Sequence, residues 1–355
     1  MIEIDGSYGE GGGQILRTAV SLSAVTMKPV RILNIRAGRP SPGLKKQHIA
    51  GIRVTGMLVN AEIEGLEVGS TEVVFKPRER VSGRFSYDVG TAGSISLVLQ
   101  AVLPPAVLAS EPVVIDLKGG TDVAWSPPID FIKSVFVPFL KMMGADVRID
   151  VKRRGHYPRG GGRVVCTVAP TSGIQPLKHI EFRAVTQVEG ISHCVRLPSH
   201  IAKRQAIAAR DVIQREIHVE PNIVLETYLR ENDPHRGPGS GIVLWAVSDT
   251  GARVGADSLG ERGKPAETVG QEAARKLVSE LSTGMAVDSH VSDMLVPYLA
   301  LAEGDSVIGI TKVTSHLETN VWVAGNILGT EMRLDIFPDE RGKLSVRGRG
   351  LASFS

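Results

Sequence analysis

The sequence predicts a mixed α/β (α+β) fold in which three repeated βαβαββ units form one large domain and a smaller α/β domain is inserted in the third unit. Two observations support this prediction. The order strand, helix, strand, helix, strand, strand recurs three times along the 355 residues, and self-similarity at a long period indicates an internally repeated fold. Residues 183–280 interrupt the third round with a helix-on-sheet pattern of their own, which predicts a compact insert. The expected boundaries are therefore 1–182 with 281–355 for the large domain and 183–280 for the inserted domain.

The first round opens on a short strand and a glycine-rich turn. Ile2 and Ile4 alternate with acidic residues, as in a strand, and apolar residues at helical spacing begin at Ile15. Between them, residues 9–14 read Gly-Glu-Gly-Gly-Gly-Gln, where the backbone can approach a phosphate closely. This pattern is neither the dinucleotide-binding fingerprint nor the P-loop. Glu10 is a candidate ligand for a metal on a triphosphate, although a solvated turn acid is the more common role.

A basic loop follows the second strand of this round. That strand is expected over 30–35 and the next helix over 44–59, and the prolines and glycines between them mark a loop. The loop and the start of the helix gather Arg36, Arg39, Lys45, Lys46, Gln47 and His48. A solvated basic loop is the usual explanation for such a group. A phosphate-binding site is the more specific one, because arginine binds phosphate through two parallel hydrogen bonds. Strands over 61–64 and 72–75 complete the round.

The second and third rounds repeat this order. In the second, strands are expected over 84–88, 112–117, 147–149 and 164–168, and helices over 92–108 and 128–143. The third begins with a strand near 180–182 and resumes with a helix over 290–301, a strand over 306–310, a helix that contains His316, and strands over 333–336 and 343–346. The insert is expected to hold strands over 190–196, 222–229 and 241–246, helices over 199–217 and 266–281, and glycine-rich loops over 231–241 and 248–264.

The start of the last predicted helix carries the most suggestive histidine. Thr314 or Ser315 can serve as its N-cap, and Glu318 occupies the place of a capping-box acid. His316 then lies in the first turn, where free backbone N–H groups and the helix dipole favour an anion. A neutral imidazole beside a bound phosphate is a candidate nucleophile for phosphoryl or nucleotidyl transfer. A plain polar residue near the cap is the alternative interpretation.

Composition narrows the class of protein. The net charge of +3 gives no global electrostatic footprint for nucleic acid, and the aromatic content of 5% argues against a base-stacking platform. Two cysteines fit neither a disulfide framework nor a zinc site, so a reducing, cytoplasmic location is the simplest expectation. The N-terminus lacks the features of a signal peptide, and no apolar run reaches the length of a membrane span. No membrane partner is therefore expected.

The motifs together resemble those of the RNA 3′-terminal phosphate cyclases over essentially the whole chain. The opening Asp5-Gly6-x-x-Gly9-Glu10-Gly11-Gly12-Gly13-Gln14-Ile15-Leu16-Arg17 is similar to the N-terminal signature of that family. His316-Leu317-Glu318-Thr319-Asn320 matches the His-Leu-x-Thr-Asn context of the family's nucleophilic histidine. Further matches, in the family's order, are Arg36-Ala37-Gly38-Arg39, Pro42-Gly43-Leu44 with Gln47-His48, Gly119-Gly120-Thr121 with Pro127-Pro128, His156-Tyr157-Pro158-Arg159-Gly160-Gly161-Gly162, and His290-Val291-Ser292-Asp293-Met294.

This resemblance implies a specific reaction. Members of the family convert an RNA 3′-terminal phosphate into a 2′,3′-cyclic phosphodiester and consume ATP. His316 would attack the α-phosphorus of ATP to give a covalent histidine–AMP and pyrophosphate, and the RNA phosphate would then accept the AMP. The neighbouring 2′-OH would attack the activated phosphate and expel AMP. Covalent catalysis splits a difficult activation into easier steps, and the need for a 2′-OH makes RNA, not DNA, the substrate.

The resemblance also assigns candidate site residues and a fold. Glu10 would hold the divalent metal on the triphosphate. The terminal RNA phosphate or the phosphates of the nucleotide would be bound by Arg17, Arg36, Arg39, Gln47 and His48. The ATP-binding pocket would be formed by Gln100, Pro127, Phe131, His290, Val291, Ser292, Asp293 and Met294. The three units would share one core related to that of the enolpyruvyl transferases.

Two other functions compete with the cyclase. One is a non-catalytic, cyclase-like RNA-binding protein of ribosome assembly, which would lack the nucleophilic histidine. The other is an enolpyruvyl transferase, whose motifs this chain does not match. The sequence leaves open the natural RNA, the choice between a monomer and a homo-oligomer, the role of the insert, the strictness for ATP, and the choice between Mg²⁺ and Mn²⁺, since both are hard cations suited to oxygen ligands.

Overall fold

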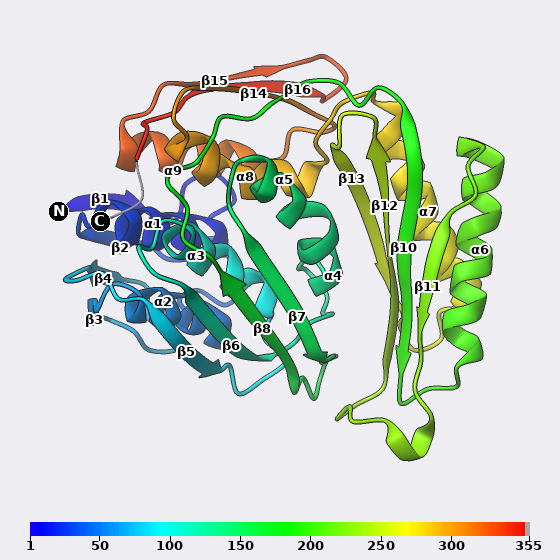
Figure 1. Cartoon of the computed structure of the whole chain (residues 1–355). Coiled ribbons are helices and arrows are strands. Elements are labelled where there is room, and N and C mark those ends of the chain that lie inside the picture. The colour runs from blue at the N-terminus through cyan, green and yellow to red at the C-terminus, as the bar shows by residue number, and fades with distance from the viewer. Residues whose placement is uncertain (352–355) are drawn as a thin grey trace.

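The computed structural model describes residues 1–351, and within that range the chain forms four sheets of four strands each, with helices packed against them (Figure 1). Each sheet contains both parallel and antiparallel neighbours. The predicted mixed α/β class is confirmed. In Figure 1 the sheet of β14, β15 and β16 forms the top of the molecule, and the sheet of β10 to β13 stands at the right.

The first sheet has the order β1-β2-β4-β3, with β1 at Ile2–Asp5, β2 at Val30–Leu33, β3 at Glu62–Glu64 and β4 at Val73–Lys76. Helix α1, Gly13–Thr26, follows β1, and helix α2, Lys46–Met57, follows β2. Nearly every residue of α1 is buried, since α2, α3 and α9 all pack against it. Burial on several sides explains why the apolar pattern of α1 is almost continuous.

The second sheet has the order β5-β6-β8-β7, with β5 at Gly83–Asp88, β6 at Val113–Gly119, β7 at Val147–Arg153 and β8 at Gly162–Val168. Helix α3, Ile95–Val107, is capped by Ser94, whose Oγ accepts a hydrogen bond from the Leu97 N–H at 3.2 Å. The helix expected over 128–143 consists of α4, Ile129–Phe131, a π-helical segment, Ile132–Phe136, and α5, Val137–Met142. Pro138 has no N–H to donate to the preceding turn, and a widened turn accommodates its ring.

The third sheet combines one strand that precedes the fourth sheet in the sequence with three strands that follow it. Its order is β9-β14-β16-β15, with β9 at Lys178–His179, β14 at Asp305–Ile310, β15 at Met332–Ile336 and β16 at Gly342–Arg347. Helix α8, Ser289–Leu301, precedes β14, and helix α9, Ser315–Leu328, follows it. The two helices pack together and lie beneath the sheet in Figure 1.

The fourth sheet has the order β11-β10-β12-β13, with β10 at Val185–Val195, β11 at Asn222–Glu226, β12 at Gly239–Ser248 and β13 at Arg253–Leu259. Helices α6, His200–Ile217, and α7, Ala266–Ser282, pack against its strands, and α4 and the π-helical segment also contact β12 or β13. Strand β12 is therefore buried along nearly its whole length, as expected for a strand covered on both faces.

The first three sheets share one pairing pattern. In each, the first two strands along the chain are parallel: β1 with β2, β5 with β6, and β9 with β14. The last strand along the chain, which is β4, β8 or β16, pairs antiparallel with both of its neighbours. The spatial order in all three sheets is first, second, fourth, third, counted along the chain.

Two sequence-based expectations were wrong in detail. The strand expected near 180–182 lies at β9 instead, because Ile180 and Phe182 exchange backbone hydrogen bonds with Ala286 and Gly284 and leave the sheet. Residues 248–264 were expected to be a loop, yet they contain β13. The strand was missed because Gly255 was interpreted as a loop residue. Gly255 instead allows close packing, since a Cβ there would come within 2.6 Å of Val135.

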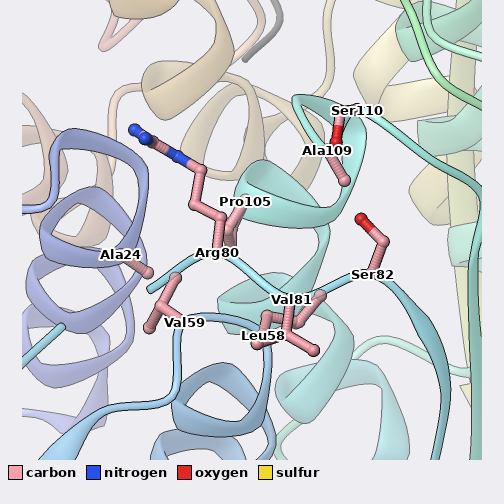
Figure 2. Close-up of a pocket in the computed structure, with 9 residues that line it drawn as sticks. All are labelled: Ala24, Leu58, Val59, Arg80, Val81, Ser82, Pro105, Ala109 and Ser110. Atoms are coloured by element: carbon pink, nitrogen blue, oxygen red, sulfur yellow. The ribbon is translucent and has the colours of Figure 1, made fainter. Parts of the chain in front are cut away.

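Two cavities in the described part of the chain lie away from the predicted site residues. One, of about 20 Å³, lies between the ends of α1, α2 and α3, is lined by Ala24, Leu58, Val59 and Pro105 among others, and has the Arg80 side chain beside it (Figure 2). This volume holds little more than one water molecule. A larger, open groove crosses the third sheet and is lined by Lys178, Arg333 and Arg347. None of the described helices is long and apolar enough to cross a membrane.

The third sheet offers a direct test of which strand face is the core. Ile308 in β14 is fully buried, whereas its neighbour Val307 is half-buried and lines the outer groove. We expect Ile308→Ala to lower the free energy of unfolding by about 2–5 kcal/mol, because it leaves a cavity, and Val307→Ala to lower it by less than about 1.5 kcal/mol. Urea denaturation of the two variants measures both values, and equal losses would contradict the assigned strand faces.

Candidate active site

His316 lies in the first turn of helix α9, directly after its first residue, Ser315. Thr314 is the N-cap, as one of the two sequence alternatives proposed: its Oγ1 accepts a hydrogen bond from the Leu317 N–H at 3.0 Å. The same hydroxyl donates to Oδ1 of Asp293 on α8 at 2.8 Å. Because Thr314 is held by two helices, the first turn of α9 is fixed, and the half-exposed His316 projects from it.

Glu10 lies directly opposite this turn. Its Oε1 accepts a hydrogen bond from Ser315 Oγ at 2.7 Å, its Oε2 accepts one from Arg39 at 3.0 Å, and Oε2 lies 3.5 Å from His316 Nε2. The carboxylate thus joins the glycine-rich turn after β1, the basic loop after β2, and the start of α9. Of the site residues predicted from the sequence, Arg39 and His316 both lie in contact with Glu10.

The glycine-rich turn can approach α9 because it has no side chain at Gly9. A Cβ on Gly9 would come within 2.8 Å of Thr319 Oγ1, and Gly9 has a φ of 58°, a conformation that side chains disfavour. Beside it, the Tyr8 ring stacks on the Trp322 ring, with centroids 4.0 Å apart and planes 9° from parallel. These contacts hold Glu10 over the first turn of α9.

Hydrogen bonding, burial and neighbouring charges determine the protonation states of Glu10 and His316. The hydrogen bond from Ser315 is the main reason that the pKa of Glu10 lies below its ordinary value, so Glu10 is ionised at neutral pH. Burial lowers the pKa of His316, and the Glu10 carboxylate opposes this shift only in part. His316 is therefore mainly neutral at pH 7, which leaves a ring nitrogen with the lone pair that nucleophilic attack requires.

A basic wall lines the other side of Glu10, at the N-terminus of α1. The N-cap of this helix is Gly12, which has no side chain to cap the free N–H groups. A Cβ on Gly13 would come within 2.5 Å of His48 Nε2 and 3.1 Å of an Arg17 terminal nitrogen, so both side chains reach the first turn. Uncapped N–H groups with cations beside them form an anion site.

The protonation of this wall follows from its contacts. His48 Nδ1 accepts a hydrogen bond from the Lys45 N–H at 3.0 Å, and burial lowers the pKa of His48 to about 3, so the neutral ring carries its proton on Nε2 and can donate it. Burial also lowers the pKa of Arg17 to about 10, and Arg17 remains a cation at pH 7. Its side chain donates to Gln14 Oε1.

Two predicted phosphate-binding residues have structural contacts of their own. Arg36 donates from Nη1 to the carbonyls of Ser41 and Gly43, at 2.7 and 3.0 Å, and so shapes the basic loop. Gln47 Oε1 accepts from the Ser94 N–H at 3.5 Å, which is a long contact. Neither interaction places the residue against Glu10 or His316.

Most of the predicted ATP-binding residues are buried. The ring of Phe131 is fully buried and makes an edge-to-face contact with the His290 ring, with centroids 5.9 Å apart. His290 is the second residue of α8, whose N-cap Asp288 accepts hydrogen bonds from the His290 and Val291 N–H groups. Three residues point into the core instead of an open pocket: Val291, Ser292 and Met294. Gln100 and Pro127 are half-buried, and the described contacts do not link either of them to the aromatic pair.

Asp293 and Asn320 bind the helices of the site together. Burial raises the pKa of Asp293 to about 7, against the hydrogen bond from Thr314 and the charge of Arg17. The fully buried Asn320 accepts from Thr18 Oγ1 at 2.6 Å and donates to the Asp293 carbonyl at 2.7 Å. Asp293 was predicted to line the ATP pocket. No local pattern relates Asn320, Ser315 and Arg39 to one another, because only the fold brings these segments together.

Comparison with known proteins gives one family. The family model described as RNA 3′-terminal phosphate cyclase matches residues 8–334. Several curated proteins that carry the name RNA 3′-terminal phosphate cyclase are similar along their whole length. The protein of Methanopyrus kandleri is 52% identical over 350 residues, which is 99% of both chains. That of Staphylothermus marinus is 49% identical over 354 residues, again 99% of both, and that of Hyperthermus butylicus is 53% identical over 350 residues, 98% of this chain and 96% of its own.

The contact between Glu10 and His316 predicts a titration result. Because the Glu10 carboxylate raises the pKa of His316, Glu10→Gln should lower that pKa further. Glu318→Gln, which removes an exposed carboxylate from the same first turn, should leave it where it is. NMR titration of the His316 ring protons measures both changes. An unaltered His316 pKa in Glu10→Gln would show that the two groups do not interact in solution.

Proposed function

The chain belongs to the RNA 3′-terminal phosphate cyclase family, and we propose that it converts an RNA 3′-terminal phosphate into a 2′,3′-cyclic phosphodiester at the expense of ATP. The observation that carries this proposal is the placement of a neutral, half-exposed imidazole at the start of α9, 3.5 Å from an ionised carboxylate and across from an uncapped helix N-terminus. A nucleophile, an anion site and a carboxylate are the groups that nucleotidyl transfer requires.

In the first step, a ring nitrogen of His316 attacks the α-phosphorus of ATP. An N–P bond forms, the bond to the bridging oxygen breaks, and pyrophosphate leaves. The α1 N-terminus with Arg17, Arg39 and His48 is suited to hold the negative charge of the phosphates, because it combines N–H donors with cations. Arg36 and Gln47 contribute by shaping the loop and the helix from which Arg39 and His48 project.

The RNA enters in the second and third steps. An oxygen of its 3′-phosphate attacks the phosphorus of AMP, and the N–P bond to His316 breaks. The vicinal 2′-OH then attacks the 3′-phosphorus, loses its proton, and AMP departs with the electrons of the anhydride bond. AMP is a far better leaving group than the oxygen of a phosphomonoester, which is the reason for the activation. We expect the RNA end that enters the site to be single-stranded, because unpaired nucleotides can be splayed out into a pocket.

The adenosine would lie toward Phe131 and His290. This pair stands at the N-terminus of α8, which packs beside α9, so a nucleotide held at His316 can reach it. Gln100 and Pro127 would contribute to the same pocket. The buried residues Val291, Ser292 and Met294, together with Asp293, would support its wall from beneath.

The residue suited to hold a divalent metal is Glu10. Its carboxylate is exposed enough to accept an ion and ends in two oxygens, and oxygen donors with phosphate suit Mg²⁺ or Mn²⁺. Such an ion would offset the charge of the triphosphate as the imidazole approaches. In its absence, Arg39 and Ser315 hold the carboxylate in position.

We also infer the domain organisation from the sheets. The shared pairing of the first three supports three βαβαββ units in one large domain, 1–182 with 281–355, of the kind found in the enolpyruvyl transferases. The fourth sheet, with its two helices, supports an inserted α/β domain at 183–280. Both cysteines are free and buried, in keeping with a cytoplasmic location.

Labelling with α-³²P ATP tests the proposed function. The wild-type protein should acquire an acid-labile, base-stable label, as a phosphoramidate does, and His316→Ala should reduce it to background because the nucleophile is gone. His200→Ala, at an exposed histidine on α6, is the matched control and should keep the label. Circular dichroism of each variant verifies the fold.

Addition of an RNA that ends in a 3′-phosphate completes the test. The label should leave the protein as AMP, and the RNA end should become resistant to phosphatase. An RNA with a 2′-deoxy terminal nucleotide should accept AMP without cyclising, because it has no attacking hydroxyl. The absence of label with either Mg²⁺ or Mn²⁺ would favour the non-catalytic, RNA-binding alternative, and label retained in His316→Ala would place the nucleophile elsewhere.

A further inference from the structure

A second group of polar side chains is buried where the fourth sheet meets the second. This junction cluster consists of Asp122 after β6, Arg154 and His156 after β7, His193 in β10, and Glu226 at the end of β11. Asp122, Arg154, His156 and His193 are each at most 7% exposed. None of the proposed active-site residues belongs to it, so it calls for an explanation of its own.

We propose that Asp122, His156 and His193 bind a divalent transition-metal ion, zinc by the chemistry of the donors, which joins the fourth sheet to the second. One carboxylate and two imidazoles are a donor set that zinc accepts, with a water or another ligand in the fourth position. The proposal is independent of the cyclase reaction, because the cluster shares no residue with the site at Glu10 and His316.

The geometry brings the three donors within reach of one ion. One oxygen of Asp122 and one ring nitrogen from each histidine all lie within 4.8 Å of one another. His193 Nε2 is 3.9 Å from Asp122 Oδ1, and the two imidazole centroids are 5.2 Å apart. Donors around a tetrahedral zinc ion are roughly 3.4 Å apart, given bonds of about 2.1 Å. Binding of an ion would therefore require the side chains to draw together by up to about 1.4 Å, the difference between 4.8 Å and this spacing.

Three of the four imidazole nitrogens of His156 and His193 lack a hydrogen-bond partner in the described structure. Both nitrogens of His193 and Nε2 of His156 are buried and make no hydrogen bond there. A buried polar atom without a partner costs roughly 1–3 kcal/mol, and such atoms are uncommon in native proteins. Ring nitrogens that make no hydrogen bond are free to coordinate an ion.

The charge of the cluster also favours a cation. Arg154 is the one guanidinium among three carboxylates: it contacts both oxygens of Asp122 at 3.3 Å, Asp130 at 2.5 Å, and Glu226 at 2.8 and 2.6 Å. Asp122 and Glu226 alone exceed the charge of Arg154 by one negative charge, and an ionised Asp130 would add a second. Buried charge is costly unless it is balanced. A divalent ion would complete the balance.

The positions of the ligands indicate what the ion would do. Asp122 and His156 stand at the end of the second sheet, and His193 stands on β10 of the fourth. Coordination from both sides would fix the fourth sheet against the rest of the protein. Metal binding of this kind contributes directly to the free energy of folding.

The metal content of the full chain, purified without a histidine tag, tests this proposal. After incubation with Zn²⁺ and exhaustive dialysis, inductively coupled plasma mass spectrometry should find about one zinc ion per chain in the wild-type protein. His193→Asn should lose it, whereas His200→Asn, at an exposed histidine, should retain it. Glu10→Gln should retain it as well, which separates this ion from any metal held on a triphosphate.

Stability and spectroscopy keep the test decisive if His193→Asn does not fold. Removal of zinc with a chelator should lower the Tm of the wild-type protein, and added Zn²⁺ should restore it. Co²⁺ in place of zinc should give the visible absorption of a tetrahedral site, which excess Zn²⁺ abolishes. A wild-type protein that retains no zinc, shows no such absorption and keeps its Tm in chelator would overturn the proposal and leave buried water as the partner of the histidines.

Discussion

The candidate active site depends on one buried side chain that contacts three helices. Asn320 is fully buried in α9, and its amide accepts a hydrogen bond from Thr18 of α1 and donates one to the backbone of Asp293 in α8. A buried amide that lost either partner would be left unsatisfied at a cost of roughly 1–3 kcal/mol. The bonds therefore fix the relative positions of α1, α8 and α9. The uncapped N-terminus of α1, the aromatic pair at α8 and His316 on α9 are aligned as a consequence.

Within this frame, Glu10 organises the electrostatics. Its carboxylate is the meeting point of Ser315, Arg39 and His316, and its negative charge partly offsets the effect of burial on the imidazole. The imidazole nevertheless remains neutral at pH 7, which a nucleophile requires, while Arg17 remains charged despite its burial. The site thus combines a neutral imidazole with a cationic wall. A polyanion such as ATP would be attracted without the histidine being protonated.

Histidine occupies two different environments in this protein, one at the candidate active site and one in the junction cluster. At the candidate active site, His316 is half-exposed on the first turn of a helix and lies beside Glu10. At the junction cluster, His156 and His193 are buried between two sheets, with nitrogens that no described residue satisfies. The first arrangement permits reaction with a bound nucleotide, and the second is suited to holding an ion permanently. Burial and access distinguish the two roles, because the chemistry of the ring is the same in both.

The sequence by itself determined the order of the elements, the family resemblance and the residue at the start of α9, because these are encoded in local spacing: apolar periodicity, a Thr-Ser cap and contiguous motifs. It failed at β13, where Gly255 is required by packing against Val135, and at β9, where Ile180 pairs outside the sheet. Tertiary structure alone decided that Glu10, Arg39 and Ser315 meet, and that Asp122, His156 and His193 converge. These residues are far apart along the chain, and no local pattern records a contact that only folding creates.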